Sequence, residues 1–317
     1  MRRFLFACVL GLSVASLGPS SENAATAAGG RILTGPVPTT QTPPSESLPD
    51  RARLPLRGNR ILAFYGKPGA KSMGILGEYS KEEVANLLFG YAKLYADALA
   101  AQEKGEAPAS GVIPAFYLVY GACWPGGDIG YLSDSVVKEW IDYAASQGIL
   151  VFLDHQIGRY GVKDAMDHLL PWLAYPNVQL ALDPEWRTEN PMQEIGSISA
   201  DELNQAQSQM SDYLKSQGIQ GDRLLVVHQF TAGMIAGRDK VKADWPGVLL
   251  IHTTDGFGSP SLKKSVYSWN AKAVNMPLKG VKLFLKGPVP GAGFDDPLLT
   301  PVQVLDLVPT PELIIYQ

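Results

Sequence analysis

Two acidic residues, Asp183 and Glu185, follow an apolar stretch that begins at Val178, and Trp186 comes directly after them. We interpret residues 178–186 as a β-strand, in which successive side chains point to opposite faces. The odd-numbered residues, both acids among them, then share one face, and the even-numbered apolar residues share the other. The pattern predicts that the two carboxylates stand one above the other at the end of this strand.

Carboxyl groups this close together change each other's proton affinity. One ionised carboxylate disfavours ionisation of its neighbour, so that one of them can remain an acid near neutral pH. Such an acid can protonate a poor leaving group, for example the oxygen of a glycosidic bond. We therefore predict that Glu185 is a general acid and that Asp183 is its electrostatic partner. The alternative is structural: Asp183 begins a loop and accepts backbone hydrogen bonds.

Further polar residues follow other apolar stretches, where the strands of a parallel barrel would end. They are Asp154, Gln156, His228, Gln229, Asp255 and Lys286. Asp154 and Asp255 are candidates for a second catalytic carboxylate, which would position water or stabilise positive charge on a sugar. Acids and imidazole on one rim could also hold a metal ion. The sequence has no H-E-x-x-H motif, however, and we predict no metal ligands and no cofactor.

Aromatic residues gather near the same predicted strand ends. Their flat apolar faces suit the C–H faces of pyranose rings, although filling of the core would explain several of them equally well. Trp124 lies in a Pro/Gly-containing loop and Trp186 adjoins the predicted acid, so these two are the stronger candidates. The residues that we expect to bind substrate are Tyr65, Tyr120, Trp124, Gln156, Trp186, His228, Gln229, Lys286 and Tyr316.

Eight short apolar stretches are typical of strands that are buried on both faces of a parallel sheet. They are residues 60–66, 112–121, 149–157, 178–186, 223–230, 248–254, 281–286 and 312–316. Helical patterns separate most of them. Capping boxes at Ser80–Glu83 and Ser199–Glu202 each begin a helix, and Gly148 and Gly218 each end one. The alternation predicts an α/β protein with a parallel sheet.

Eight strands in about 260 residues favour a closed (β/α)8 barrel of the TIM type, which typically has ~250 residues. The sequence contains no G-x-G-x-x-G loop after the first strand and no P-loop motif, which speaks against a nucleotide-binding open sheet. The last predicted strand ends the sequence, and residues 231–244 are only weakly helical. We therefore expect a barrel that can be incomplete at its last helix.

Leu182-Asp183-Pro184-Glu185 resembles the D-x-E motif on the fourth strand of several glycoside hydrolase barrels, among them family 25 muramidases and, more loosely, family 18 chitinases. The resemblance implies that Glu185 protonates the glycosidic oxygen, with Asp183 in support. Only the last half of the longer D-x-x-D-x-D-x-E motif is present. The seventh predicted strand ends in Lys286, where other retaining glycosidases have a nucleophilic Glu, so the resemblance assigns no covalent nucleophile.

The N-terminal residues 1–27 have the features of a secretory signal peptide: a basic start, a short apolar middle and an A-x-A site at residues 25–27. The apolar stretch of about 14 residues is short of the ~20 that span a bilayer. Residues 28–58, rich in Pro, Ser and Thr, are predicted to be a disordered linker. Residues 59–317 would form one domain. We expect a secreted or cell-envelope protein without a stable membrane span after processing.

The composition, with 46% hydrophobic residues and a net charge of −4, is that of a globular protein and gives no reason to expect a nucleic-acid partner. Three functional hypotheses follow. The first is an exported hydrolase of glycosidic bonds in a polysaccharide or cell-envelope glycan. The second is an exported barrel that binds a glycan without catalysis. The third is a metal-dependent hydrolase or deacetylase that uses Asp154, His228 and Asp255.

Overall fold

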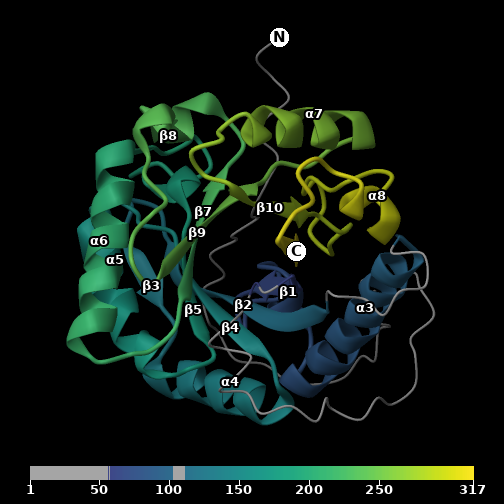
Figure 1. Ribbon diagram of the computed structural model, residues 1–317, viewed down its shortest axis with the longest axis horizontal. Helices are drawn as coiled ribbons and strands as arrows, with labels where there is room; N and C mark the ends of the chain where they lie inside the picture. Colours follow the sequence, from purple (N-terminus) through teal and green to yellow (C-terminus); the bar gives the residue numbers. More distant parts are fainter. Residues whose placement is uncertain (1–55, 57, 103–110) are drawn as a thin grey trace, which may run out of the picture.

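The computed structural model describes residues 56, 58–102 and 111–317. The predicted signal peptide and almost all of the predicted linker lie outside these residues. The sequence patterns in the described part produce a closed barrel of parallel strands surrounded by helices (Figure 1). The predicted (β/α)8 barrel is confirmed.

The barrel strands occur close to where the apolar stretches predict them. In chain order they are β1 (Arg60–Gly66), β2 (Val112–Cys123), β4 (Leu150–His155), β5 (Val178–Leu182), β7 (Arg223–Gln229), β9 (Val248–Thr254), β10 (Leu278–Leu283) and β11 (Leu313–Tyr316). Each pairs in parallel with its neighbours in the order β1-β11-β10-β9-β7-β5-β4-β2, and the β1–β2 pairing closes the ring. The carboxyl ends of all these strands therefore meet at one mouth of the barrel.

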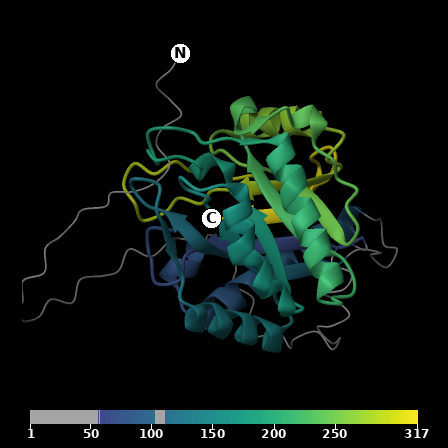
Figure 2. The same ribbon diagram turned by 90° about the vertical axis from the view of Figure 1, so that its left-hand side faces the viewer.

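Helices cover the outside of the barrel, as Figures 1 and 2 show from two directions. They are α2 (Ile75–Glu78), α3 (Lys81–Gln102), α4 (Asp134–Gln147), α5 (Val162–Leu169), α6 (Ala200–Ser216), α7 (Pro260–Ala271) and α8 (Pro301–Leu305). The predicted capping box of α6 is present, and Gly148 ends α4 with a φ of 73°. Among the described helices, none is both long and apolar enough to cross a membrane.

The helical layer is thinner after β7. Residues 231–244, where the sequence pattern is weakly helical, form the 3-10 turns η3 (Ala232–Met234) and η4 (Arg238–Lys240), with the short strand β8 (Ile235–Ala236) between them. Strand β8 pairs with β6 (Ile198–Ser199), and β3 (Ile129–Tyr131) pairs antiparallel with the end of β2. These additions lie on the loops at the carboxyl ends of the strands, where a barrel builds its functional site.

Two apolar layers stabilise the barrel, one inside it and one between strands and helices. Strand β5 contributes to both: Ala181 packs inside, whereas Leu180 and Leu182 pack against the helices. This is the alternation predicted for the segment that leads to Asp183. The strand ends at Leu182, four residues earlier than predicted, because Pro184 has no N–H to continue the ladder and starts the 3-10 turn η2 (Pro184–Trp186).

Candidate functional site

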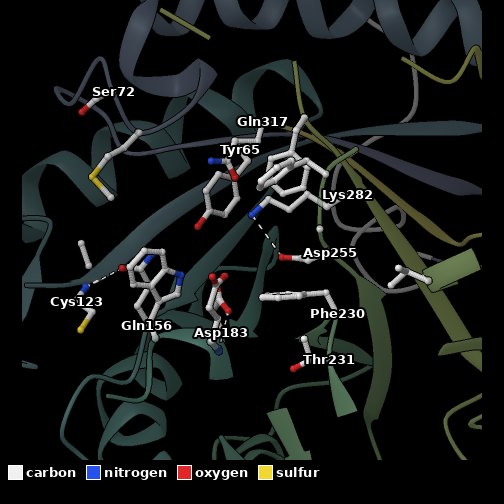
Figure 3. A pocket seen from close by; sticks show the side chains of 18 of the residues that line it. Tyr65, Ser72, Cys123, Gln156, Asp183, Phe230, Thr231, Asp255, Lys282 and Gln317 are labelled. Carbon is white, nitrogen blue, oxygen red and sulfur yellow. Dashed lines mark hydrogen bonds and ion pairs between the residues drawn. The ribbon is translucent and has the colours of Figure 1, made fainter. Parts of the chain in front are cut away.

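A pocket of about 450 Å³ lies at the carboxyl-terminal mouth of the barrel (Figure 3). Loops and strand ends from most of the ring contribute to its lining. Of the predicted site residues, those that line it are Tyr65, Trp124, Gln156, Asp183, Glu185, Trp186 and Asp255. The structure therefore brings both acids of the D-x-E segment and one candidate second carboxylate into a single concavity, together with three of the predicted aromatic residues.

The turn after β5 fixes both acids. Asp183 is buried, and its N–H donates to the carbonyl of His155 at 3.0 Å. Its Oδ1 accepts a hydrogen bond of 3.3 Å from the N–H of Glu185, which caps η2. The structural alternative is thus correct about the backbone hydrogen bond. It is incomplete, however, because the carboxyl group of Asp183 also lines the pocket beside that of Glu185.

Burial makes both of these groups acids near neutral pH. Removal from water raises the pKa of Asp183 to about 7, although His228 and Lys282 act in the opposite direction. Burial, with smaller contributions from Asp183 and Asp255, raises the pKa of Glu185 to about 8. At pH 7 the side chain of Glu185 is therefore mostly protonated and can donate a proton to a bound molecule.

Asp255, which follows β9, two strands from β5 in the ring, has the reverse character. Burial alone would raise its pKa, but the positive charges of His228 and Lys282 lower it. Its carboxylate accepts a hydrogen bond of 2.9 Å from Nδ1 of His228 and lies 3.7 Å from Nζ of Lys282. The pocket thus combines a protonated Glu185 with an ionised Asp255, which is the pairing that acid–base catalysis by two carboxyl groups needs.

Lys282 on β10 is a central cation of the site. It is buried, and its Nζ lies 3.7 Å from the centre of the Tyr65 ring as well as near Asp255 (Figure 3). The cation over the ring stabilises both side chains where they face the pocket. Lys282 is not among the predicted site residues, because the apolar pattern predicts the seventh strand three residues too late and so points to Lys286. The available signal was a single lysine inside the apolar run Val281–Leu285.

Asp154 lies next to the site but outside the pocket lining. It is fully buried, and its Oδ2 accepts a hydrogen bond of 3.0 Å from the hydroxyl of Tyr65. Its Oδ1 has no hydrogen-bond partner among the described residues, and burial raises its pKa. Asp154 therefore holds Tyr65 in place and does not reach the pocket, whereas Asp255, the other candidate for a second catalytic carboxylate, lines it.

His228 also lies beneath the pocket. Its two ring nitrogens are both occupied, Nδ1 by Asp255 and Nε2 by the hydroxyl of Tyr117 at 2.6 Å. Burial by itself lowers the pKa of His228, but the surrounding carboxylates, Asp255 first, raise it to about 9. The imidazole is thus charged and offers no lone pair to a metal, and no acid, His or Cys cluster among the described residues has a metal-holding arrangement.

Five predicted substrate-binding residues do not line the pocket, among them His228 beneath it, and we correct these assignments. Tyr316 faces the helices, since its hydroxyl pairs with that of Tyr95 at 2.8 Å. Tyr120 also faces outward and packs edge-on against Trp172. Gln229 is buried, and its Oε1 accepts a hydrogen bond from His252. Lys286 is exposed beyond the end of β10, beside Phe294.

Several lining residues have no signal in the sequence, because helix α7, loops and the ends of strands far apart in the chain supply them. They include Met73, Leu262, Lys263, Val266, Phe284 and Gln317. Lys263 is buried, and its Nζ makes an ion pair of 3.1 Å with Asp295 and donates to the carbonyl of Lys282 at 2.8 Å. This buried pair supports the segment on which Lys282 stands.

No family model matches the chain, and no curated protein sequence matches it. Solved structures with a similar fold include 2,3-dimethylmalate lyase, a member of the PEP mutase/isocitrate lyase superfamily. It is 11% identical to this chain, with a TM-score of 0.44, and the match covers 86% of this chain and 81% of that chain. A family 18 chitinase from Crocus vernus is 11% identical (65% and 82% covered, TM-score 0.34). An endo-β-1,4-glucanase from Xanthomonas axonopodis pv. citri is 9% identical (82% and 88% covered, TM-score 0.41).

These neighbours include lyases as well as glycosidases. At such identities and TM-scores, the similarity does not indicate the reaction of this chain. The function has to be inferred from the side chains in the pocket.

Proposed function

We propose that this protein hydrolyses glycosidic bonds, with Glu185 as the general acid. The observation that supports the proposal most directly is the pairing of a protonated Glu185 with an ionised Asp255 in one pocket. Glu185 lines the pocket beside Asp183, and burial, with a smaller contribution from Asp183, keeps the pKa of Glu185 high. Trp124, Trp186 and Gln156 provide apolar faces and a polar group to hold a sugar ring.

In the proposed reaction, Glu185 gives its proton to the glycosidic oxygen while the bond from that oxygen to the anomeric carbon breaks. A water molecule forms the new bond to the anomeric carbon, and Asp255 takes the proton that this water loses. The negative charge of Asp255 also stabilises the positive charge that develops on the sugar. Transfer of a proton from Asp255 to Glu185 through solvent restores both groups for the next cycle.

Replacement of Glu185 by Gln tests the proposal. The amide keeps the size of the side chain but has no acidic proton to donate. We therefore expect the rate of hydrolysis to fall by about 10²-fold or more. The exposed Glu189, four residues along the same loop, supplies the matched control, and Glu189→Gln is expected to retain full activity. Release of reducing sugar from a panel of glycosides and cell-wall glycans is the measurement.

Two results would contradict the proposal. One is a Glu185→Gln variant that is as active as the wild type. The other is a wild-type protein that binds glycans, measured by calorimetry, and releases no product from any of them, which would favour the non-catalytic alternative.

We also propose that the protein is exported and that its partner is a carbohydrate of the cell envelope or the surroundings. The support for export is the sequence of residues 1–27, and the support for a carbohydrate partner is the lining of the pocket. Expression in a bacterial host, followed by N-terminal sequencing of the protein found outside the cytoplasm, is expected to give a chain that begins at Ala28. Full-length protein retained in the cytoplasm would contradict export.

A further inference from the structure

The two sides of the pocket differ in chemistry. On the side of β2 and β4, the lining includes Gln156, Cys123 and Trp124. The side of β7, β9 and β10 includes the polar residues Thr231, Asp255, Lys263 and Lys282. It also includes five side chains without a polar atom, which we name the apolar wall: Phe230, Phe257, Leu262, Val266 and Phe284. Because β5 lies between β4 and β7 in the ring, the acids at its end stand between the two sides (Figure 3).

The apolar wall is a preformed structure. The rings of Phe257 and Phe284 meet edge-on at 6.1 Å. The Phe257 ring also lies against Gly293, where an added Cβ would come within 2.1 Å of it, so the chain leaves room for this ring by having no side chain there. The buried carboxylate of Asp295 accepts hydrogen bonds of 2.9 Å from the N–H groups of Gly258 and Phe284. These bonds fix the segments that carry both rings.

Part of the wall is open to water. Leu262, in the first turn of α7, keeps 52% of its surface exposed although it lines the pocket. A ligand that covers an exposed leucine with apolar atoms gains the hydrophobic free energy of both surfaces, whereas a ligand that covers it with hydroxyl groups loses their hydration. The free energy of binding therefore favours an apolar group at this position.

Apart from Thr231, Asp255, Lys263 and Lys282, this side of the pocket offers a sugar ring no partner for its hydroxyl groups, since none of the five side chains of the apolar wall donates or accepts a hydrogen bond. The ring can satisfy these groups on the side of Gln156, beside the acids. The glycosidic oxygen that Glu185 protonates then lies at the border between the two sides, and the group beyond this oxygen points at the wall. The volume of about 450 Å³ suits a small molecule held in this way.

We infer that the preferred substrate is a glycoside of an apolar alcohol, with an aryl or alkyl leaving group packed on Phe257, Leu262 and Phe284. The inference rests on the proposed function, because it assigns the leaving group of that reaction. The bond that breaks joins the anomeric carbon to the oxygen of this alcohol. The proton from Glu185 makes the alcohol neutral, so that it leaves the wall as an uncharged molecule.

Matched substrates test the inference. For each sugar in a panel of α- and β-glycosides, kcat/KM is measured for the n-octyl and the methyl glycoside. We expect the octyl compound to be hydrolysed at least tenfold more efficiently, since each buried methylene group can contribute this much discrimination. Leu262→Ser is expected to reduce the octyl-to-methyl ratio by about tenfold. Val274→Ser, a change at an exposed residue that does not line the pocket, is expected to leave the ratio as it is.

A binding measurement separates this inference from the proposed function. 4-Methylumbelliferone, a fluorescent apolar alcohol, is titrated into Glu185→Gln and into the double variant Glu185→Gln/Leu262→Ser. Tighter binding to the single variant supports the apolar wall as the site of the leaving group. Hydrolysis of methyl and octyl glycosides at equal rates, without binding of this probe, overturns the inference and leaves the proposed function intact. If binding of 4-methylumbelliferone depends on Leu262 but no glycoside is hydrolysed, the proposed function is refuted. The assignment of a leaving group is then refuted as well, and the apolar wall is a binding site only.

Discussion

Nδ1 of His228, which is buried beneath the pocket, donates a hydrogen bond across 2.9 Å to the buried carboxylate of Asp255, which lines the pocket. The pKa of His228 is raised to about 9 and that of Asp255 is lowered, so the two groups form an ion pair at neutral pH. This pair keeps one carboxylate ionised after β9, two strands from β5 in the ring, whereas at the end of β5 burial raises the pKa of two others. The division of roles among the acids depends on it.

Replacement of His228 by Gln is expected to destabilise the protein in a pH-dependent way. The folded pKa of about 9 lies above the ordinary value of about 6.5, so the stabilisation is complete below pH 6.5 and is lost as the pH rises through 9. We expect the free energy of unfolding to fall by about 3–5 kcal/mol at pH 6, since Asp255 loses its buried partner. Urea denaturation at pH 6 and pH 9.5 measures the difference.

The exposed His168 is the control for this prediction. His168→Gln is expected to leave the free energy of unfolding within about 0.5 kcal/mol of the wild type at both pH values. A His228→Gln variant that is destabilised equally at pH 6 and pH 9.5 would show that the charge on His228 contributes nothing.

The activity of the proposed hydrolase is expected to decline on the alkaline side. Glu185, with a pKa raised to about 8, loses the proton that it has to donate, and the rate then falls about tenfold per pH unit. Asp183→Asn removes a negative charge that raises this pKa, so we expect it to move the decline toward lower pH. Profiles of kcat/KM between pH 5 and pH 10 test both statements. A rate that rises through pH 8 would mean that Glu185 acts as a base.

The same Asp183→Asn variant is expected to be more stable than the wild type at alkaline pH. The folded pKa of about 7 exceeds the ordinary 3.8, so ionisation of Asp183 costs stability that is lost progressively as the pH rises from 3.8 to 7. We expect the advantage of the variant to grow by roughly 2 kcal/mol between pH 5 and pH 9. Thermal unfolding at both pH values measures it, with Asp201→Asn on the exposed start of α6 as a control.

The sequence predicts the part of the site that depends on local periodicity. The even-numbered residues before Asp183 are all apolar, which predicts that they face the helices and that the odd-numbered residues line the barrel, and Ala181 lies inside as expected. Strand β11 has no such alternation, because Leu313, Ile314 and Ile315 are all apolar. The orientation of Tyr316 could therefore not be read from the sequence, and its side chain faces the helices.

The sequence does not predict the interactions that loops make across the mouth. Lys263 and Asp295 are 32 positions apart and belong to the connections after β9 and β10. Each alone looks like an ordinary surface charge, and only the closed ring brings them within 3.1 Å of each other. The contact between Lys282 and the ring of Tyr65 is equally absent from the sequence pattern. Strands β1 and β10 are far apart in the chain, and only the closed ring brings these two side chains to one pocket.

Asp295→Asn is expected to damage both stability and catalysis, because it leaves Lys263 charged and buried without its partner. Loss of one member of such a pair costs about 3–5 kcal/mol. Lys263 also donates to the carbonyls of Gly256 and Lys282. Its displacement therefore moves Lys282 itself and the residue that directly follows Asp255. The neighbouring Asp296 is exposed, and Asp296→Asn is expected to be neutral. Urea denaturation and kcat of the two variants provide the comparison; equal stability of both would mean that the Lys263–Asp295 pair does not support the site.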